Sequence, residues 1–179
     1  RIVSTDDTRT AGGLTPEAVY RKSRPFDYCR TADENAAPQD HLLYLKLPTA
    51  LDVGKRYTVE FQRASLASRN AGFIYDPTAL PSDAVHVSQI GFRPDDPVKV
   101  AFLSCWMGDG GGLRYPDKIA FSLIDAKSGK PVFRGNSERT KRAIGTGREN
   151  ARDFEKTDVY ELDFGAFDQP GIYRVSVAG

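Results

Sequence analysis

The sequence predicts an all-β protein made of two consecutive β-sandwich domains. Three observations lead to this prediction. Short apolar segments recur along the chain between turn residues, and the 179 residues include 16 Gly and 11 Pro. No segment has the apolar periodicity of a long helix. A proline-bounded stretch at residues 76–83 reads as a stiff hinge, which divides the chain into a domain at residues 1–80 and a domain at residues 81–179.

The composition limits the classes of function. Charged residues make up 27% of the chain and balance to a net charge of +1, which argues against a nucleic-acid partner because phosphate binding needs clustered positive charge. The apolar runs are too short to cross a bilayer. Arg1 is not a natural start, so we expect a processed or cloned fragment whose targeting signal lies outside it.

In the first domain the strongest strand signals lie at residues 41–47 and 57–61. The second of these follows the Gly54 turn and places Tyr57, Val59 and Phe61 on one face. Shorter strands are predicted at residues 2–3, 18–20 and 73–75. A surface loop is predicted at residues 30–40, and a polar tip or short helical turn at residues 65–70. The pattern resembles generic immunoglobulin-like and fibronectin-like sandwiches, which have about seven strands. Fewer are predicted here, so the domain is either short or lacks its beginning.

The second domain opens with a strand predicted at residues 85–90, which Gly91 ends. A rigid turn between Pro94 and Pro97 follows. Further strands are predicted at residues 99–105, 119–124, 132–133, 159–164 and 172–177. Residues 136–157 carry many charges of both signs and few apolar side chains, which predicts a long solvated loop.

The order of these segments resembles the immunoglobulin-like module that precedes the catalytic domain of family 9 glycoside hydrolases. The opening residues 86–94, His-Val-Ser-Gln-Ile-Gly-Phe-Arg-Pro, are similar to the family's Val-Asn-Gln-Val-Gly-Tyr-x-Pro. Ser88 stands in place of the Asn and Phe92 in place of the Tyr. Segments at residues 99–103, 121–125, 130–135, 159–164 and 170–177 follow in the family's order, so the resemblance covers residues 85–179.

The resemblance implies a non-catalytic accessory region of a secreted β-glucan-degrading or cellulose-degrading hydrolase. Such a region would pack on the catalytic barrel of the same polypeptide and stabilise it. The family holds its paired carboxylates in a helical barrel that begins with an Asp-Ala-Gly-Asp type motif, which this sequence lacks, so we expect no enzymatic activity from this chain. The candidate residues for the domain interface are Gln89, Phe92, Arg93 and Trp106, which lie on or just beyond the opening strands.

The resemblance also implies one more strand after residue 177. Without it, an open sheet edge and a bare apolar surface predict self-association of the fragment. A different class of function is a carbohydrate-binding or adhesion module, in which Trp106 and Tyr115 would stack on sugar rings and a polysaccharide would be the partner. A structural spacer in a surface protein is a third hypothesis.

No cofactor or metal site is predicted. The aspartates at residues 95, 96, 109 and 117 lack the alternating spacing of a calcium loop, and His41 and His86 lie on strands of different domains. The glycine-rich residues 108–112 do not open a helix, so they predict a turn rather than a phosphate-binding loop. Cys29 and Cys105 lie in different domains. The sequence neither requires nor excludes a disulfide between them, and it favours a buried free thiol for Cys105, which lies on an apolar strand.

Overall fold

The computed structural model describes residues 1–10, 12–26, 29–30, 35–61, 68–143 and 156–177. The chain divides into two compact units, Arg1–Pro81 and Ser82–Gly179. Within the described residues the helical segments are two short 3-10 turns, η1 (Thr8–Thr10) and η2 (Gly108–Gly110), and all other regular structure is β. The predicted all-β fold class is therefore confirmed.

The first unit contains a three-stranded antiparallel sheet. Its strands are β1 (Ile2–Val3), β6 (Arg56–Glu60) and β7 (Asn70–Ile74), in the order β1-β6-β7. Ile2 and Tyr57 are almost fully buried, and the Tyr57 ring packs on that of Phe73 with centroids 5.9 Å apart. Tyr57, one of the three residues predicted to share a face of this strand, is therefore buried. Residues 62–67, which include half of the polar tip or helical turn predicted at residues 65–70, lie outside the described residues.

A polar cluster, in which Asp7 and Tyr57 are buried and Arg9 and Asp52 are about half exposed, connects the start of this unit to its sheet. The Tyr57 hydroxyl donates to the Asp7 carboxylate at 2.8 Å and accepts the backbone N–H of Asp52 at 2.9 Å. Arg9 forms ion pairs with Asp7 at 2.9 Å and with Asp52 at 2.8 Å. Because buried polar groups are costly unless paired, this cluster ties segments that lie about fifty residues apart in sequence.

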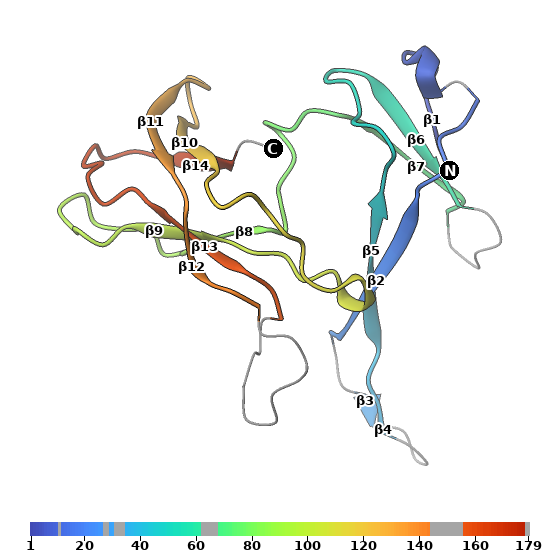
Figure 1. Ribbon diagram of the computed structural model, residues 1–179, viewed down its shortest axis with the longest axis horizontal. Coiled ribbons are helices and arrows are strands. Elements are labelled where there is room, and N and C mark those ends of the chain that lie inside the picture. The colour runs from blue at the N-terminus through green and yellow to red at the C-terminus, as the bar shows by residue number, and fades with distance from the viewer. Residues whose placement is uncertain (11, 27–28, 31–34, 62–67, 144–155, 178–179) are drawn as a thin grey trace. The chain divides into compact units, whose positions relative to one another are not determined.

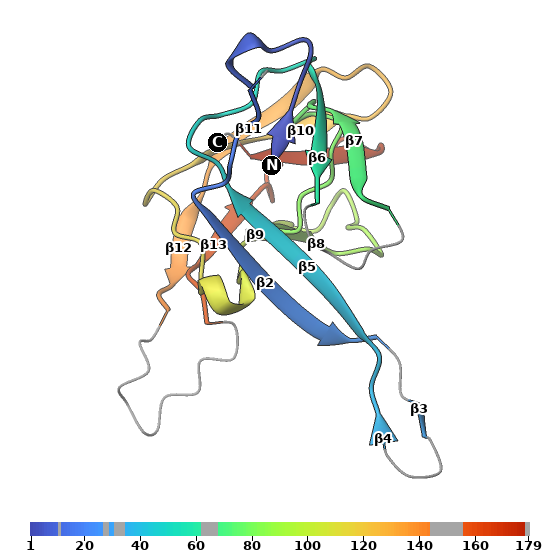
Figure 2. The same ribbon diagram turned by 90° about the vertical axis from the view of Figure 1, so that its right-hand side faces the viewer.

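A long hairpin completes the first unit. Strands β2 (Ala18–Pro25) and β5 (Gln39–Lys46) pair along their whole length, and the small pair β3 (Cys29–Arg30) and β4 (Asn35–Ala36) lies beyond the end of this hairpin (Figure 2). The predicted strand at residues 18–20 is therefore too short, and the predicted loop at residues 30–40 contains strands. Apolar alternation fails to reveal this ribbon because much of it faces solvent on both sides.

The second unit is a β-sandwich whose two layers can be followed in Figure 1. One sheet has the order β11-β10-β14 and the other the order β12-β13-β9-β8, and all neighbours are antiparallel. The strands are β8 (Val85–Val87), β9 (Val100–Leu103), β10 (Ala120–Asp125), β11 (Pro131–Asn136), β12 (Glu138–Lys141), β13 (Val159–Asp163) and β14 (Tyr173–Val177).

The sandwich core is formed by alternate residues of the central strands. Its buried members are Ala101, Leu103, Ile119, Phe121, Leu123, Tyr160, Leu162 and Phe164. They come from β9 and β13 in one sheet and from β10 in the other, with Ile119 and Phe164 immediately beside strands. This is the period-2 burial expected where two sheets pack face to face.

Two sequence predictions for this unit are wrong in detail. The opening strand ends at Val87, not at residue 90, because the chain turns at Ser88–Gly91, where the Gly91 N–H donates to the Ser88 carbonyl at 3.4 Å and Gly91 has a φ of 77°. The predicted loop at residues 136–157 contains strand β12, and Arg139 of that strand forms an ion pair with Asp117 at 2.6 Å. Residues 144–155 of that prediction lie outside the described residues.

Candidate functional site

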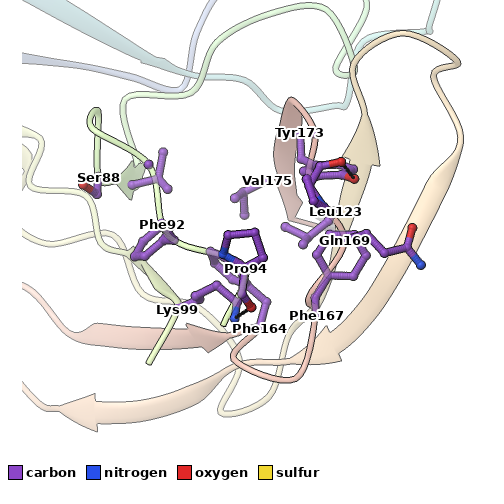
Figure 3. Close-up of a pocket in the computed structure, with 14 residues that line it drawn as sticks. Ser88, Phe92, Pro94, Lys99, Leu123, Phe164, Phe167, Gln169, Tyr173 and Val175 are labelled. Carbon is purple, nitrogen blue, oxygen red and sulfur yellow. Dashed lines mark hydrogen bonds between the residues drawn. The ribbon is translucent and has the colours of Figure 1, made fainter. Parts of the chain in front are cut away.

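An apolar groove opens in the second unit between the edges of its two sheets. Strands β8 and β14 are the end strands of their sheets, and both contribute to the groove walls. The groove has a volume of about 220 Å³. Figure 3 shows Ser88 and Phe92 on one side of it and Tyr173 and Val175 on the other. The groove therefore lies where the sandwich is open rather than inside a closed core.

Aromatic rings build the groove from segments far apart in sequence. Phe92 meets Phe164 edge to face with centroids 5.4 Å apart, and Phe167 meets Tyr173 in the same way at 4.9 Å. Phe167 also packs on Phe133 at 6.0 Å. Edge-to-face pairs of this kind add to the stabilisation from burial, so these walls are held in place by the core.

The loop that follows β8 is fixed by a buried lysine. Lys99 is 4% exposed, and its ammonium group donates to the carbonyl of Pro94 at 2.9 Å and to the carbonyl of Asp96. Arg93 pairs with Asp95 through two hydrogen bonds, of 3.0 and 2.8 Å, on the exposed outer side of the same turn. The charged groups of this turn thus shape the loop, and Ser88, Phe92 and Pro94 are its side chains that line the groove.

The structure places the four predicted interface residues in two separate places. Gln89 and Arg93 are exposed and Phe92 is half-buried, and all three follow β8. The β8–β9 ladder runs from Val85 opposite Leu103 to Val87 opposite Ala101. Because the strands are antiparallel, Trp106, which follows β9, lies at the other end of this pair of strands. The structure groups Gln89, Phe92 and Arg93, but not Trp106, around one end of the sandwich.

Trp106 and Tyr115, the predicted carbohydrate-binding pair, have different surroundings. Trp106 is half-buried, and the Lys156 ammonium lies 5.4 Å from its ring centroid. Tyr115 packs edge to face on the core residue Tyr160 at 5.8 Å, and burial raises the pKa of Tyr115 to about 12. The Trp106 ring therefore has the Lys156 ammonium close to it, and the Tyr115 ring packs against the core. Carbohydrate binding through this pair stays a prediction.

Within the described ranges no group of three or more His, Cys, Asp or Glu side chains is arranged to hold a metal ion. Cys105 is a buried thiol, 7% exposed, whereas the side chain of Cys29 lies outside the described residues. Over the same described ranges, we find no helix with the length and apolarity needed to span a membrane.

Sequence reasoning missed two features of this region. Ile90 is 97% exposed, because the turn after β8 points it into solvent, whereas the predicted strand would have extended through it. The groove itself also escaped prediction, since Phe164, Phe167 and Tyr173 reach it from segments that the sequence separates from Phe92 by about seventy residues or more. Gly91 was the sequence signal for the turn that exposes Ile90, because its positive φ is a conformation that glycine adopts readily.

The paired sheets and aromatic core define the second unit as an immunoglobulin-like β-sandwich domain. Residues 81–179, more than half of the chain, match the family model of the cellulase N-terminal Ig-like domain. The chain therefore belongs to this family, and the resemblance seen in the ordered strand segments is confirmed. Searches of curated proteins and of solved structures gave no match.

Proposed function

We propose that this chain is the non-catalytic N-terminal part of a secreted glycoside hydrolase that degrades cellulose or a related β-glucan. The second unit packs on the catalytic domain of the same polypeptide and stabilises it. The family match carries this proposal, because it assigns residues 81–179 to an N-terminal domain of cellulases. An interface that is buried only when both domains are folded couples their stabilities, so loss of one domain lowers the stability of the other.

The turn after β8 supplies the best candidate surface for this contact. Ile90 is 97% exposed and Val87 is 48% exposed, next to the exposed side chains of Gln89 and Arg93. An apolar side chain held in solvent by a fixed turn gains free energy when a partner covers it, about 1.5–3 kcal/mol for full burial of an isoleucine. This supports the predicted interface role of residues 89, 92 and 93.

The proposal is tested first by the coding sequence that follows residue 179. A helical barrel with the Asp-Ala-Gly-Asp type motif is expected there, and a continuation without a glycosidase domain would overturn the proposal. In the parent polypeptide, Ile90→Ser should then lower the melting temperature of the catalytic domain. Val132→Ser is the matched control, because Val132 is 40% exposed on β11 of the other sheet and should leave that temperature unchanged. Equal effects of the two variants on the melting temperature would contradict the assignment of the turn after β8 to the domain interface.

A further inference from the structure

The outer face of the four-stranded sheet of the second unit carries an aromatic ring near its centre. In this sheet β13 and β9 lie between β12 and β8 (Figure 1). Ala101 and Leu103 of β9 are buried in the core, whereas Phe102 between them is 39% exposed. Because successive side chains of a strand point to opposite faces, the Phe102 ring lies on the outer face of the sheet.

Hydrogen-bonding side chains flank this ring across the strands. His86 of β8 and Glu161 of β13 lie directly opposite Phe102, and Glu138 of β12 lies directly opposite Glu161. Residues that face each other in a ladder share a face of the sheet, so these four side chains form one row, called here the Phe102 row. With neighbouring strands roughly 4.8 Å apart, the row is about 14 Å long.

The polar groups of the Phe102 row act as hydrogen-bond acceptors. His86 Nε2 lies 3.1 Å from the carbonyl oxygen of Ser104. A carbonyl oxygen only accepts, so this contact assigns the proton to Nε2 and leaves Nδ1 of the neutral ring as an acceptor. The carboxylates of Glu161 and Glu138 are acceptors as well. A ligand of this row therefore has to bring the donors.

The stability of the sheet does not explain the two carboxylates of the row. Like charges directly opposite each other in a ladder repel and lower stability. Within the described ranges neither Glu138 nor Glu161 forms an ion pair, and Arg139, the next residue of β12, pairs with Asp117 and Asp158 instead. Positions that act against the stability of a fold are typical of binding sites.

We propose that the Phe102 row binds a neutral polysaccharide chain of the β-glucan class. The identity of the sugar rests on the proposed function. A pyranose ring has an apolar C–H face, which stacks on an aromatic ring, and a rim of hydroxyl groups, which donate hydrogen bonds. A sugar that stacks on Phe102 therefore brings hydroxyl groups to Glu161 on one side and to His86 on the other. The next sugar of the chain reaches Glu138.

The chemistry of the row favours this ligand over others. An acidic sugar or a phosphate would meet carboxylates of its own sign. An apolar side chain of a partner would cover the ring but leave the acceptors without donors. A cationic protein segment could pair with Glu138 and Glu161, but it offers no repeat of apolar faces and donors. A neutral sugar chain has both along its whole length, as the ring and the acceptors of the row require.

Titration of the chain of residues 1–179 with cellohexaose, followed by backbone NMR, tests the proposal. Binding should shift the amide signals of β8, β9, β12 and β13 around the row and should reach saturation. An acidic chain of the same length, hexagalacturonate, should cause no shifts. No binding of cellohexaose, shifts centred on Trp106 and Tyr115, or binding of hexalysine in place of cellohexaose would each overturn the proposal.

A pair of variants tests the aromatic ring. Phe102→Ala removes the stacking surface and should weaken cellohexaose binding by roughly tenfold or more. Phe26→Ala is the matched control, because Phe26 is 62% exposed but lies in the first unit, and it should leave the affinity unchanged. Equal affinities of the two variants would count against the row.

A third variant separates binding from folding. Glu161→Gln keeps the size of the side chain and removes one of the two opposed charges. We expect the urea midpoint of unfolding, measured by Trp106 fluorescence, to rise because the repulsion from Glu138 is lost. We expect the affinity for cellohexaose to fall by about threefold or more, because hydrogen bonds to a charged acceptor are the stronger ones. Unchanged affinity, or a fall of the midpoint together with the affinity, would overturn the proposal.

The coding sequence after residue 179 tests the proposed function separately. A glycosidase domain there, without cellohexaose binding by the chain, would overturn this inference alone, and binding without such a domain would overturn the proposed function alone. In the parent polypeptide, Phe102→Ala should lower retention on insoluble cellulose and Phe26→Ala should not. Equal retention of these two variants would show that the row does not bind in the whole protein.

Discussion

Replacing Tyr160 by phenylalanine removes one hydroxyl group from the core of the second unit and leaves the ring in place. Tyr160 has no exposed surface, and its hydroxyl donates to the backbone carbonyl of Tyr115 at 2.8 Å. The variant loses this hydrogen bond and leaves a carbonyl without that donor, which costs about 1–2 kcal/mol. For a unit of this size the expected fall in melting temperature is roughly 5–15 °C.

The assay is thermal and denaturant unfolding followed by the fluorescence of Trp106, the one tryptophan of the sequence, which lies in the same unit. Tyr115→Phe is the matched control. It also removes a phenolic hydroxyl, but the acceptor of the Tyr160 hydrogen bond is the backbone carbonyl of residue 115, which this variant keeps. We expect the control to change stability by less than about 0.5 kcal/mol. Equal stabilities of the two variants would refute the assigned role of the Tyr160 hydroxyl.

Three further predictions concern pH, packing and activity. Hydrogen bonds from Arg9 lower the pKa of Asp7 from 3.8 to about 2 in the folded chain. This carboxylate therefore stabilises the first unit above about pH 4, and the contribution is lost as the pH falls toward 2. In the Asp7→Asn variant, the urea concentration at the midpoint of unfolding, followed by amide exchange of β6, should depend less on pH between pH 5 and 2 than it does in the parent chain. Gly165→Ala would place a Cβ atom against the Pro97 carbonyl oxygen, too close for both to keep their positions. It should lower the free energy of unfolding, measured by chemical denaturation, by about 1–3 kcal/mol. A variant as stable as the parent chain would show that the backbone at this position shifts without cost. The purified chain should not hydrolyse cellulose, lichenan or aryl glycosides, and turnover that a single Asp or Glu substitution abolishes would contradict this.

The sequence allowed prediction of strands that have a buried face. The central strands β9, β10 and β13 carry alternate apolar residues because each contributes to the core between the sheets. Strand β12 was missed, since it is an edge strand made of Glu, Arg, Thr and Lys, and Arg139 is stabilised in it by ion pairs rather than by apolar burial. The β2–β5 hairpin was underestimated for a related reason, because long-range pairing orders residues that have little apolar alternation.

The candidate site was predictable only in part. Phe92 was recognised from the opening segment, and the structure places it in the groove wall. Its partner Phe164 comes from the residue after β13, and Tyr173 from the opposite sheet, so the pairing depends on tertiary contacts that one-dimensional patterns do not encode. The separation of Trp106 from the residues after β8 likewise follows from the antiparallel register, which the sequence leaves open.

The claim that this chain docks on a catalytic domain is tested most directly by sedimentation velocity. The chain of residues 1–179 would be mixed with the separately produced catalytic part of its parent polypeptide. The account predicts a single faster-sedimenting complex, which Ile90→Ser weakens and Val132→Ser does not. Two species that sediment independently at every concentration would contradict it.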